Sequence, residues 1–319
     1  MTATNLCVCA GIDAGSSCSK LGYSDNLGTR ILARADGADF MTLREEAEIF
    51  FDEPVFSCVI AVKDDFPSRQ REAVRLKAIS AGFRDVNIIG QFEAMTLGIG
   101  DDVRTLVCDF GASRCDFAVI DDGDVIEAES RDVGGEMFTK IFAEYLRELR
   151  MLKKLDENIL SEAKRIMHIL SDDESRLWHD VNILREDFER LIYFPVKRVS
   201  HTFDMMIHVF KPERVILTGG CAKIPLVREF FTGAEIVDDL TAKGVSLKGL
   251  SLSKLEAKKS IADNTARIRA LRAEILRIEE GLTRQQKDRL YVLFRQAEGI
   301  NDSGIIAMME NLIREIKNA

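Results

Sequence analysis

This sequence predicts an α/β fold. From residue 5 to residue 231, short apolar runs bounded by Gly, Asp or Pro alternate with longer stretches of helical pattern. Strands that are separated by helices indicate a sheet covered by helices on both faces. The chain has 319 residues, of which 46% are hydrophobic and 30% charged, so it can form one large or two ordinary globular domains.

The individual elements follow from the period of the apolar residues. Apolar runs such as TLVCDF are too short for helices and are rich in strand-forming residues. The expected strands are residues 5–12, 55–62, 86–89, 105–110, 115–120 and 213–218. The expected helices are residues 68–82, 91–98, 136–154, 157–170, 185–210 and 224–231.

Two segments share a strand–turn–strand pattern, which indicates a weak internal repeat. The segments are GIDAGSSCSKLGYSD (11–25) and VCDFGASRCDFAVIDDGD (107–124). Each contains an apolar strand, an aspartate, a turn of small residues and a second strand. The corresponding aspartates are Asp13 and Asp109.

The composition changes after about residue 240, so we divide the chain into residues 1–245 and a helical segment, residues 246–319. The apolar residues of this segment recur at heptad a and d positions, which predicts a coiled coil or helical hairpin that can dimerise. An amphipathic helix packed on its own domain is the alternative. The a and d positions hold Ile261, Asn264, Ile268, Leu271, Ile275, Ile278 and Leu282. A turn at 298–305 precedes a last helix, 304–317, for which Asn301, Asp302 or Ser303 can be the cap.

Charge and cysteine content exclude several classes of protein. A formal net charge of −9 disfavours a binder of duplex nucleic acid. No apolar run approaches the ~20 residues of a membrane helix, and the N-terminus has no basic start typical of a secretory signal. The 7 cysteines form no CxxC and no Cys/His metal spacing. We therefore expect a cytoplasmic protein without nucleic-acid or membrane partners.

The two hairpins carry the residue types that hold a polyphosphate. A turn of Gly, Ala and Ser lets backbone N–H groups approach phosphate oxygens closely, and Ser16 and Ser17 add hydroxyl donors. Asp13 and Asp109 end the strands before these turns, so they are expected to meet at a Mg²⁺ ion and to hold it through water. A Gly-Gly pair at 219–220 allows the backbone to lie against a nucleotide, although an ordinary turn explains the pair equally well.

The order of the segments resembles the nucleotide-binding domain of the 70-kDa heat-shock chaperones, which belong to the actin-like ATPase superfamily. The resemblance covers about residues 8–231, and the substrate-binding domain of the chaperones does not follow. It is carried by GIDAGSS, residues 61–83, NIIGQFEAMTLGIG, VCDFGASRCDFAVIDDGD, VGGEMF, SEAKRIMHILS, LREDFERL and RVILTGGCAKIP. It implies an actin-like fold of two related, ribonuclease H-like lobes that bind ATP or ADP with Mg²⁺.

The resemblance also implies roles for individual residues. Those at the phosphates and in catalysis would be Asp13, Gly15, Ser16, Ser17, Asp109, Gly111, Ala112, Ser113, Arg114 and Asp116. Those beside the ribose, the adenine and the adenosine loop would be Gly134, Gly135, Lys164, Arg165, His168, Gly219, Gly220 and Cys221. Without the resemblance, the charged pair at 164–165 would be read as a solvated helix face.

The sequence departs from the chaperones at positions that matter for turnover. Gln91 stands where the family has a glutamate near the metal, and Arg114 replaces a threonine near the terminal phosphate. Arg114 can stabilise a transferred phosphoryl group, bind phosphate without turnover, or point to solvent. The outer insert between Tyr23 and Val55 is very short, and the catalytic lysine of that insert has no counterpart, since Lys63 belongs to the strand-to-helix connection that follows.

Lys20 offers a compensating cation. Actins and plasmid-segregation ATPases carry a phosphate-contacting lysine at this spacing after the first aspartate. On an antiparallel hairpin, Lys20 would lie on the strand opposite Asp13, where it can reach a nucleotide. A plain surface lysine is the alternative.

We therefore expect an ATP-binding, slowly hydrolysing Mg²⁺-dependent switch whose C-terminal helices engage a protein partner or form a homodimer. ATP would act by binding the closed state of the lobes more tightly than the open one. A filament-forming ATPase of the plasmid-segregation type and a catalytically inactive ATP-binding module are the alternatives. An iron–sulfur activator or a sugar kinase is disfavoured, because the cysteines have no paired spacing and no second full-sized domain is present.

Overall fold

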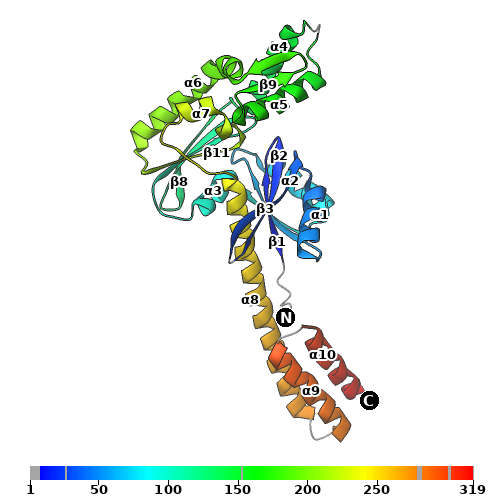
Figure 1. Ribbon diagram of the computed structural model, residues 1–319. Helices are drawn as coiled ribbons and strands as arrows, with labels where there is room; N and C mark the ends of the chain where they lie inside the picture. Colours follow the sequence, from blue (N-terminus) through cyan, green and yellow to red (C-terminus); the bar gives the residue numbers. More distant parts are fainter. Residues whose placement is uncertain (1–7, 26, 152–153, 279–281, 301–302, 319) are drawn as a thin grey trace. The chain divides into compact units, whose positions relative to one another are not determined.

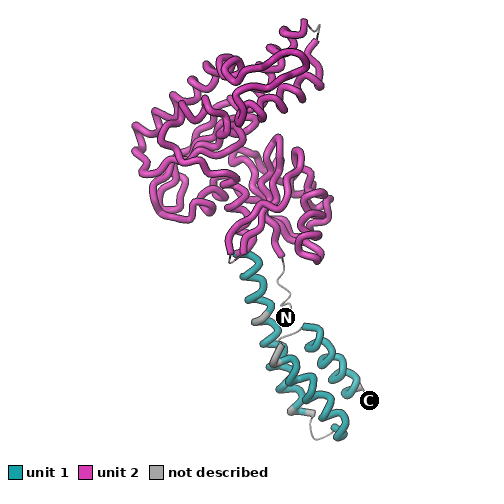
Figure 2. The backbone as a smooth tube through the Cα atoms, viewed as in Figure 1, with its two compact units in different colours: residues 1–7, 251–319 teal, residues 8–250 magenta. Residues whose placement is uncertain are grey.

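The computed structural model describes residues 8–25, 27–151, 154–278, 282–300 and 303–318. The chain divides into a larger unit, Val8–Leu250, and a second unit that contains Ser251–Ala319 (Figure 2). Two five-stranded sheets with flanking helices form two lobes within the larger unit (Figure 1). The predicted α/β class is confirmed. Among the described residues, no helix combines the length and the apolar character needed to cross a membrane.

The first lobe is built on a sheet of strand order β3-β2-β1-β4-β5. Its strands are β1 (Cys9–Ala14), β2 (Cys18–Asp25), β3 (Gly28–Asp36), β4 (Ser57–Val62) and β5 (Asp85–Gly90). Its helices are α1 (Phe40–Phe51), α2 (Ser68–Ser80) and α3 (Gln91–Ile99). Strand β1 pairs antiparallel with β2 and parallel with β4. The run SCVIAV of β4 is buried throughout, as expected for a central strand between two helical layers.

The second lobe repeats this arrangement in the order β12-β11-β6-β7-β8. Its strands are β6 (Thr105–Phe110), β7 (Cys115–Asp121), β8 (Asp124–Arg131), β11 (Arg214–Thr218) and β12 (Glu235–Ile236), with a separate hairpin of β9 (Ser175–Trp178) and β10 (Val181–Leu184). Its helices are α4 (Gly135–Leu149), α5 (Glu157–Asp172), α6 (Arg185–Phe210), η1 (Gly220–Lys223) and α7 (Pro225–Phe230). Strand β6 pairs antiparallel with β7 and parallel with β11, as β1 pairs with β2 and β4. The weak sequence repeat is therefore a repeat of structure.

Each lobe has its own apolar core. In the second lobe, the ring centroid of Phe110 lies 5.7 Å from that of Phe138 and 6.0 Å from that of Phe231. In the first lobe, Phe40 and Leu43 of α1 are fully buried against the sheet. Burial of each such side chain stabilises the fold by roughly 1.5–3 kcal/mol. The cores fix the strand ends from which the polar residues described below project.

The segment between Tyr23 and Val55, predicted as a short outer insert, contains β3 and α1. The side chain of Asp39 accepts a hydrogen bond from the backbone N–H of Thr42 at 3.2 Å and caps α1. Strand β3 escaped prediction because it lies at the sheet edge, where RILARAD mixes charged and small apolar residues. The predicted helix 136–154 is too long, because α4 ends at Leu149.

Helix α8 (Leu240–Ile278) begins in the larger unit. Its first turns pack closely on the first lobe, since a Cβ atom on Gly244 would lie 1.6 Å from the carbonyl oxygen of Ala94. In the same way, a Cβ atom on Gly11 of β1 would lie 2.6 Å from the backbone nitrogen of Ser246. Such distances exclude every side chain, so the backbone of α8 lies directly against β1 and α3.

The smaller unit contains the remainder of α8 with α9 (Arg284–Ile300) and α10 (Ser303–Asn318). The described residues of the predicted heptads are buried in its core, together with residues of α9 and α10. They are Ile268, Leu271, Ile275 and Leu282, and Asn264 is also buried. The side chains of Ile261 and Ile278, and the predicted caps Asn301 and Asp302, lie outside the described residues. The heptad stripe thus packs on helices of its own chain, and dimerisation stays a prediction.

Candidate functional site

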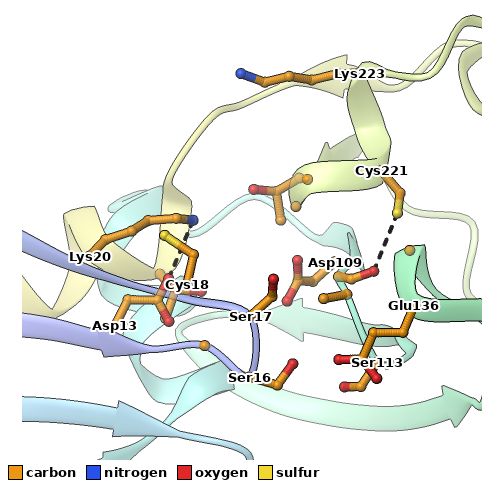
Figure 3. A pocket seen from close by; sticks show the side chains of 18 of the residues that line it. Asp13, Ser16, Ser17, Cys18, Lys20, Asp109, Ser113, Glu136, Cys221 and Lys223 are labelled. Atoms are coloured by element: carbon orange, nitrogen blue, oxygen red, sulfur yellow. Dashed lines mark hydrogen bonds and ion pairs between the residues drawn. The ribbon is translucent and has the colours of Figure 1, made fainter. Parts of the chain in front are cut away.

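A cavity of about 700 Å³ lies between the two lobes of the larger unit. Its volume is within the ~300–1,000 Å³ typical of small-molecule sites. The ends of β1, β4, β6 and β11 meet at it, and α4, α5 and the start of α8 complete its wall. Figure 3 shows the side chains of several lining residues directed into this space.

Both lobes present an aspartate followed by a tight turn to the cavity. The backbone N–H of Gly15 donates to the carbonyl oxygen of Asp13 at 3.2 Å, and that of Gly111 donates to the carbonyl oxygen of Asp109, also at 3.2 Å. The two turns are therefore built alike. Ser16, Ser17 and Ser113 add hydroxyl groups to the same space (Figure 3).

Lys20 lies opposite Asp13 in the β1–β2 register, as predicted. Its ammonium group is 3.5 Å from a carboxylate oxygen of Asp13. Burial raises the pKa of Asp13, Lys20 opposes this rise, and the negative charge of Asp109 adds to it. Burial lowers the pKa of Lys20, but Asp13 and Asp239 outweigh burial and raise it overall, so Lys20 is a cation at neutral pH.

Lys63 is a lysine of the cavity to which the sequence assigned no role. It follows β4, and its ammonium group pairs with Asp116 and lies 3.8 Å from Asp109, both in the second lobe. Burial lowers its pKa, but the two aspartates outweigh burial and raise it overall. Gln91 also crosses between the lobes, because its side-chain amide donates to Asp109. The usable signal in the sequence was that Lys63 directly follows the predicted strand 55–62. Because this strand pairs parallel with β1, Lys63 lies at the same edge of the sheet as Asp13.

Asp116 and Arg114 do not line the cavity. Asp116 is 2% exposed and accepts a hydrogen bond from Ser130 at 2.6 Å. Arg114 Nε is 2.7 Å from Asp116, and its two terminal nitrogens donate to Asp65 of the first lobe at 2.5 and 2.9 Å. A bidentate pair of this kind holds the guanidinium group in place. Arg114 therefore faces carboxylates and not the cavity, and its side chain stays 19% exposed beside the exposed Asp65.

A glycine loop beside Asp109 forms another part of the cavity wall. Gly219 has φ 92°, and a Cβ atom there would lie 2.5 Å from Asp109 Oδ1, so only glycine fits. The thiol of Cys221 donates to the carbonyl oxygen of Gly111 at 3.3 Å.

Helix α5 contributes two polar residues to the cavity, Lys164 and His168. Lys164 Nζ donates to Ser17 Oγ of the first lobe at 2.8 Å. Burial lowers the pKa of His168, and the charges of Lys164 and Lys223 lower it further, so His168 is a neutral donor and acceptor.

Most predicted site residues are brought together in this cavity. Those that line it are Asp13, Gly15, Ser16, Ser17, Lys20, Asp109, Gly111, Ala112, Ser113, Gly135, Lys164, His168, Gly219, Gly220 and Cys221. Those that do not are Gly134, which packs against Ala112, Arg165, which pairs with Glu162, and the pair Arg114 and Asp116. Lining residues that the sequence did not single out include Arg34, Lys63, Glu136, Lys140, Lys223 and Asp239.

The placement of Arg114 leads to a testable expectation. Arg114→Thr should change the affinity for nucleotide by less than about 3-fold, because the side chain contacts Asp65 and Asp116 and not the cavity. Titration calorimetry with ATP checks this, with Lys20→Met as the variant that should lose affinity. A loss in Arg114→Thr as large as in Lys20→Met would mean that Arg114 reaches the phosphates.

The cysteines provide a second expectation. Cys18 lines the cavity and is partly exposed, whereas Cys221 is buried and burial raises the pKa of its thiol to about 12. At neutral pH a thiol-specific reagent should therefore modify Cys18 much faster than Cys221. Mass spectrometry of labelled peptides would measure both, and a saturating ligand of the cavity should slow the labelling of Cys18. Rapid labelling of Cys221 would contradict the described packing.

Comparison with known proteins identifies relatives of the larger unit. The sequence model of the family described as MreB/Mbl protein matches residues 40–242. The chain is 24% identical over 237 residues to "Chaperone protein dnaK1" of Synechococcus elongatus and, over the same length, 24% identical to "Chaperone protein DnaK 3" of a Synechococcus species. Each match covers 60% of this chain and 36% of the relative. Both groups belong to the actin-like ATPase superfamily, so the predicted actin-like, chaperone-related fold is confirmed in a shortened form.

Proposed function

Because the chain belongs to the MreB/Mbl family, within the actin-like ATPase superfamily, we propose that its cavity binds ATP with Mg²⁺ and hydrolyses it slowly. The observation that best supports this proposal is the pair of aspartates, Asp13 and Asp109, each followed by the same tight turn and both lining one cavity. Backbone N–H groups of such turns are suited to phosphate oxygens.

The charges around the cavity favour one direction for a bound nucleotide. The phosphates would lie at the two turns, with Lys20 and Lys63 as cations on either side. The adenosine would lie against Gly219 and Gly220, where the wall is backbone and neutral His168 can hydrogen-bond a base. The nucleotide would thus contact both lobes, so its binding favours closure.

The carboxylates fit a Mg²⁺ ion bound mainly through water and phosphate. Asp13 is half-buried, and both its burial and the charge of Asp109 raise its pKa, so an additional cation beside the two carboxylates is favoured. No group of three or more His, Cys, Asp or Glu side chains that could hold a metal occurs in the described part of the chain. Mg²⁺ keeps several water ligands and needs only one or two carboxylates beside the phosphates, so Asp13 and Asp109 suffice. The ion would neutralise phosphate charge, and both aspartates would orient the attacking water.

In this proposal the chain is a cytoplasmic nucleotide switch, and the helices α8, α9 and α10 engage a protein partner or a second copy. The similarity to the chaperones named above supports a switch. Its energetic requirement is that ATP binds the closed lobes more tightly than the open ones. The match to the MreB/Mbl family supports a second candidate, an ATPase that forms filaments.

Sedimentation velocity separates the two candidates. Runs without nucleotide and with Mg-ATP, Mg-ADP and a non-hydrolysable ATP analogue would be compared. For a switch we expect a fixed monomer or dimer whose sedimentation coefficient changes with ATP. Large ATP-dependent polymers would overturn the switch and establish the filament. Phosphate release measured in parallel tests hydrolysis, and ATP binding without release would identify an inactive binding module.

A further inference from the structure

Asp239 lies where the chain crosses from one lobe to the other. Strand β12 belongs to the sheet of the second lobe, and the first turns of α8 pack on β1 of the first lobe and on α3. Leu240, the first residue of α8, is buried with α3 against strands of the second lobe. Only residues 237–239 separate β12 from α8. Asp239 has φ 57°, a left-handed conformation that few residues other than glycine adopt. Its carbonyl oxygen accepts the backbone hydrogen bond of Lys243 at 2.9 Å, which starts the helix.

The side chain of Asp239 holds two cations of the first lobe. One carboxylate oxygen is 3.1 Å from the ammonium group of Lys20, and the other accepts a hydrogen bond from Arg34 at 2.6 Å. Lys20 and Arg34 are neighbours in the β2–β3 register, so Asp239 bridges adjacent strands. All three residues line the cavity. The left-handed backbone and the two ion pairs fix the start of α8 against the first lobe.

Lys20 is shared between Asp239 and the phosphate side of the cavity. Its ammonium group lies 3.1 Å from Asp239 and 3.5 Å from Asp13, so the contact with Asp239 is the closer of the two. A phosphate bound at the first turn carries more charge than a carboxylate and would compete for the same ammonium group. Two anions that compete for one cation oppose each other's binding, and the coupling is reciprocal.

We propose that Asp239 is a positioning residue that links the cavity to α8: it holds Lys20 when no phosphate is bound and loses it when a nucleotide phosphate takes its place. The loosened contact then frees the first turn of α8 from β2. This inference rests on the proposed binding of ATP. The ion pair between Asp239 and Lys20 is the contact through which the cavity would act on α8, the helix that continues into the smaller unit.

Hydrogen exchange of the full chain tests the link. In the wild type, ATP should raise the exchange of peptides covering residues 237–247 by at least about 2-fold. In Asp239→Asn, the same peptides should show no ATP-dependent change, and calorimetry should show ATP binding at least about 3-fold more tightly, because Lys20 no longer has a competing carboxylate. A merely structural role for Asp239 would weaken ATP binding instead.

An aspartate outside the cavity supplies the matched control. Asp25 of β2 pairs with Arg30 of β3 at 2.7 Å, so it also bridges these two strands, but it does not line the cavity. Asp25→Asn should therefore keep the exchange response and the affinity of the wild type. If Asp239→Asn does not fold, Asp239→Gly takes its place, because glycine suits the left-handed backbone.

Three results would overturn the inference. The first is an ATP-dependent rise in hydrogen exchange in Asp239→Asn that equals that of the wild type. The second is a weaker affinity of this variant for ATP. The third is a wild type that binds ATP without any change in the hydrogen exchange of residues 237–247. In these cases the proposed ATP binding still stands. Absence of ATP binding by the wild type in calorimetry would overturn the proposed function itself, and this inference with it.

Discussion

Asp13→Asn is expected to reduce ATP hydrolysis by at least about 100-fold, the scale on which the loss of one preorganised electrostatic contact slows a reaction. Asp13 lines the cavity with its side chain 18% exposed, and it is close enough to Asp109 for the two charges to interact. Asparagine keeps the shape but cannot supply the negative charge that we propose to orient water and bind Mg²⁺. Phosphate release under saturating Mg-ATP measures the loss, and an unchanged rate would exclude Asp13 from the reaction.

The same substitution is expected to leave stability unchanged or to increase it. Burial raises the pKa of Asp13, so between the unfolded pKa and this higher native pKa the folded protein binds more protons than the unfolded chain. The free energy of unfolding therefore falls as pH rises through that window, and near neutral pH the whole cost of the buried charge is present. Asparagine removes this cost. Thermal melting near neutral pH should show an equal or higher Tm for Asp13→Asn.

The pH dependence of hydrolysis follows from the same shift. Asp13 has to be ionised in this role, and burial raises its pKa. As the pH is lowered, activity should therefore begin to fall at a higher pH than it would with a solvent-exposed aspartate.

Asp39→Ala is the control for the stability measurement. Hydrogen bonds from Thr42 lower the pKa of Asp39, which caps α1 and does not line the cavity. This variant should melt at a lower temperature and hydrolyse ATP at the wild-type rate.

The sequence predicted the parts of the site that local patterns encode. Asp13 and Asp109 were found because an aspartate, a turn of small residues and a second strand recur in both lobes. The position of Lys20 followed from the hairpin register alone. Such features depend on strand pairing between neighbours in sequence, which residue patterns describe well.

The parts that escaped prediction depend on contacts between distant segments. Lys63 follows β4 and reaches Asp116 of the other lobe, and Asp239 reaches Lys20 and Arg34 across an interval of more than two hundred residues. No local sequence pattern indicates which carboxylate will form an ion pair with a given lysine. Arg114 was weighed as a phosphate ligand or a solvated side chain, but its carboxylate partner Asp65 lies on the other lobe. The strand order and the packing of the lobes decide these pairings.

Lys63→Met is expected to lower the free energy of unfolding by about 2–4 kcal/mol. This is somewhat less than the ~3–5 kcal/mol for removing one partner of a fully buried ion pair, because the Lys63 side chain is 19% exposed. The reason is that Asp116 stays buried after its partner has been removed. Asp116 is 2% exposed, and without Lys63 the partners of its charge among the described residues are Arg114 and the hydroxyl group of Ser130. Chemical denaturation of the variant and the wild type measures the difference. A loss below about 0.5 kcal/mol would class the pair with exposed salt bridges.

A double variant separates the cost of the orphaned charge from a loss of packing. Asp116→Asn introduces a neutral side chain that can still accept the hydrogen bond of Ser130. If the unpaired charge of Asp116 is the cause, Lys63→Met with Asp116→Asn should recover more than half of the lost stability. If the lost packing of the Lys63 methylene chain is the cause, the losses of stability of the two single variants should add in the double variant.

Nucleotide binding gives Lys63→Met a second measurable effect. Lys63 lies 3.8 Å from Asp109, whereas Gly220 and His168 belong to the wall proposed for the adenosine. The variant should therefore bind ATP about 10-fold more weakly, the effect of losing one charge-assisted contact of ~1.4 kcal/mol, and bind adenosine unchanged. Equal losses for ATP and adenosine would mean that the lobes have moved apart, because Lys63 and Gln91 both join the first lobe to Asp109. The ratio of the two affinities thus distinguishes a contact with phosphate from a contact between lobes.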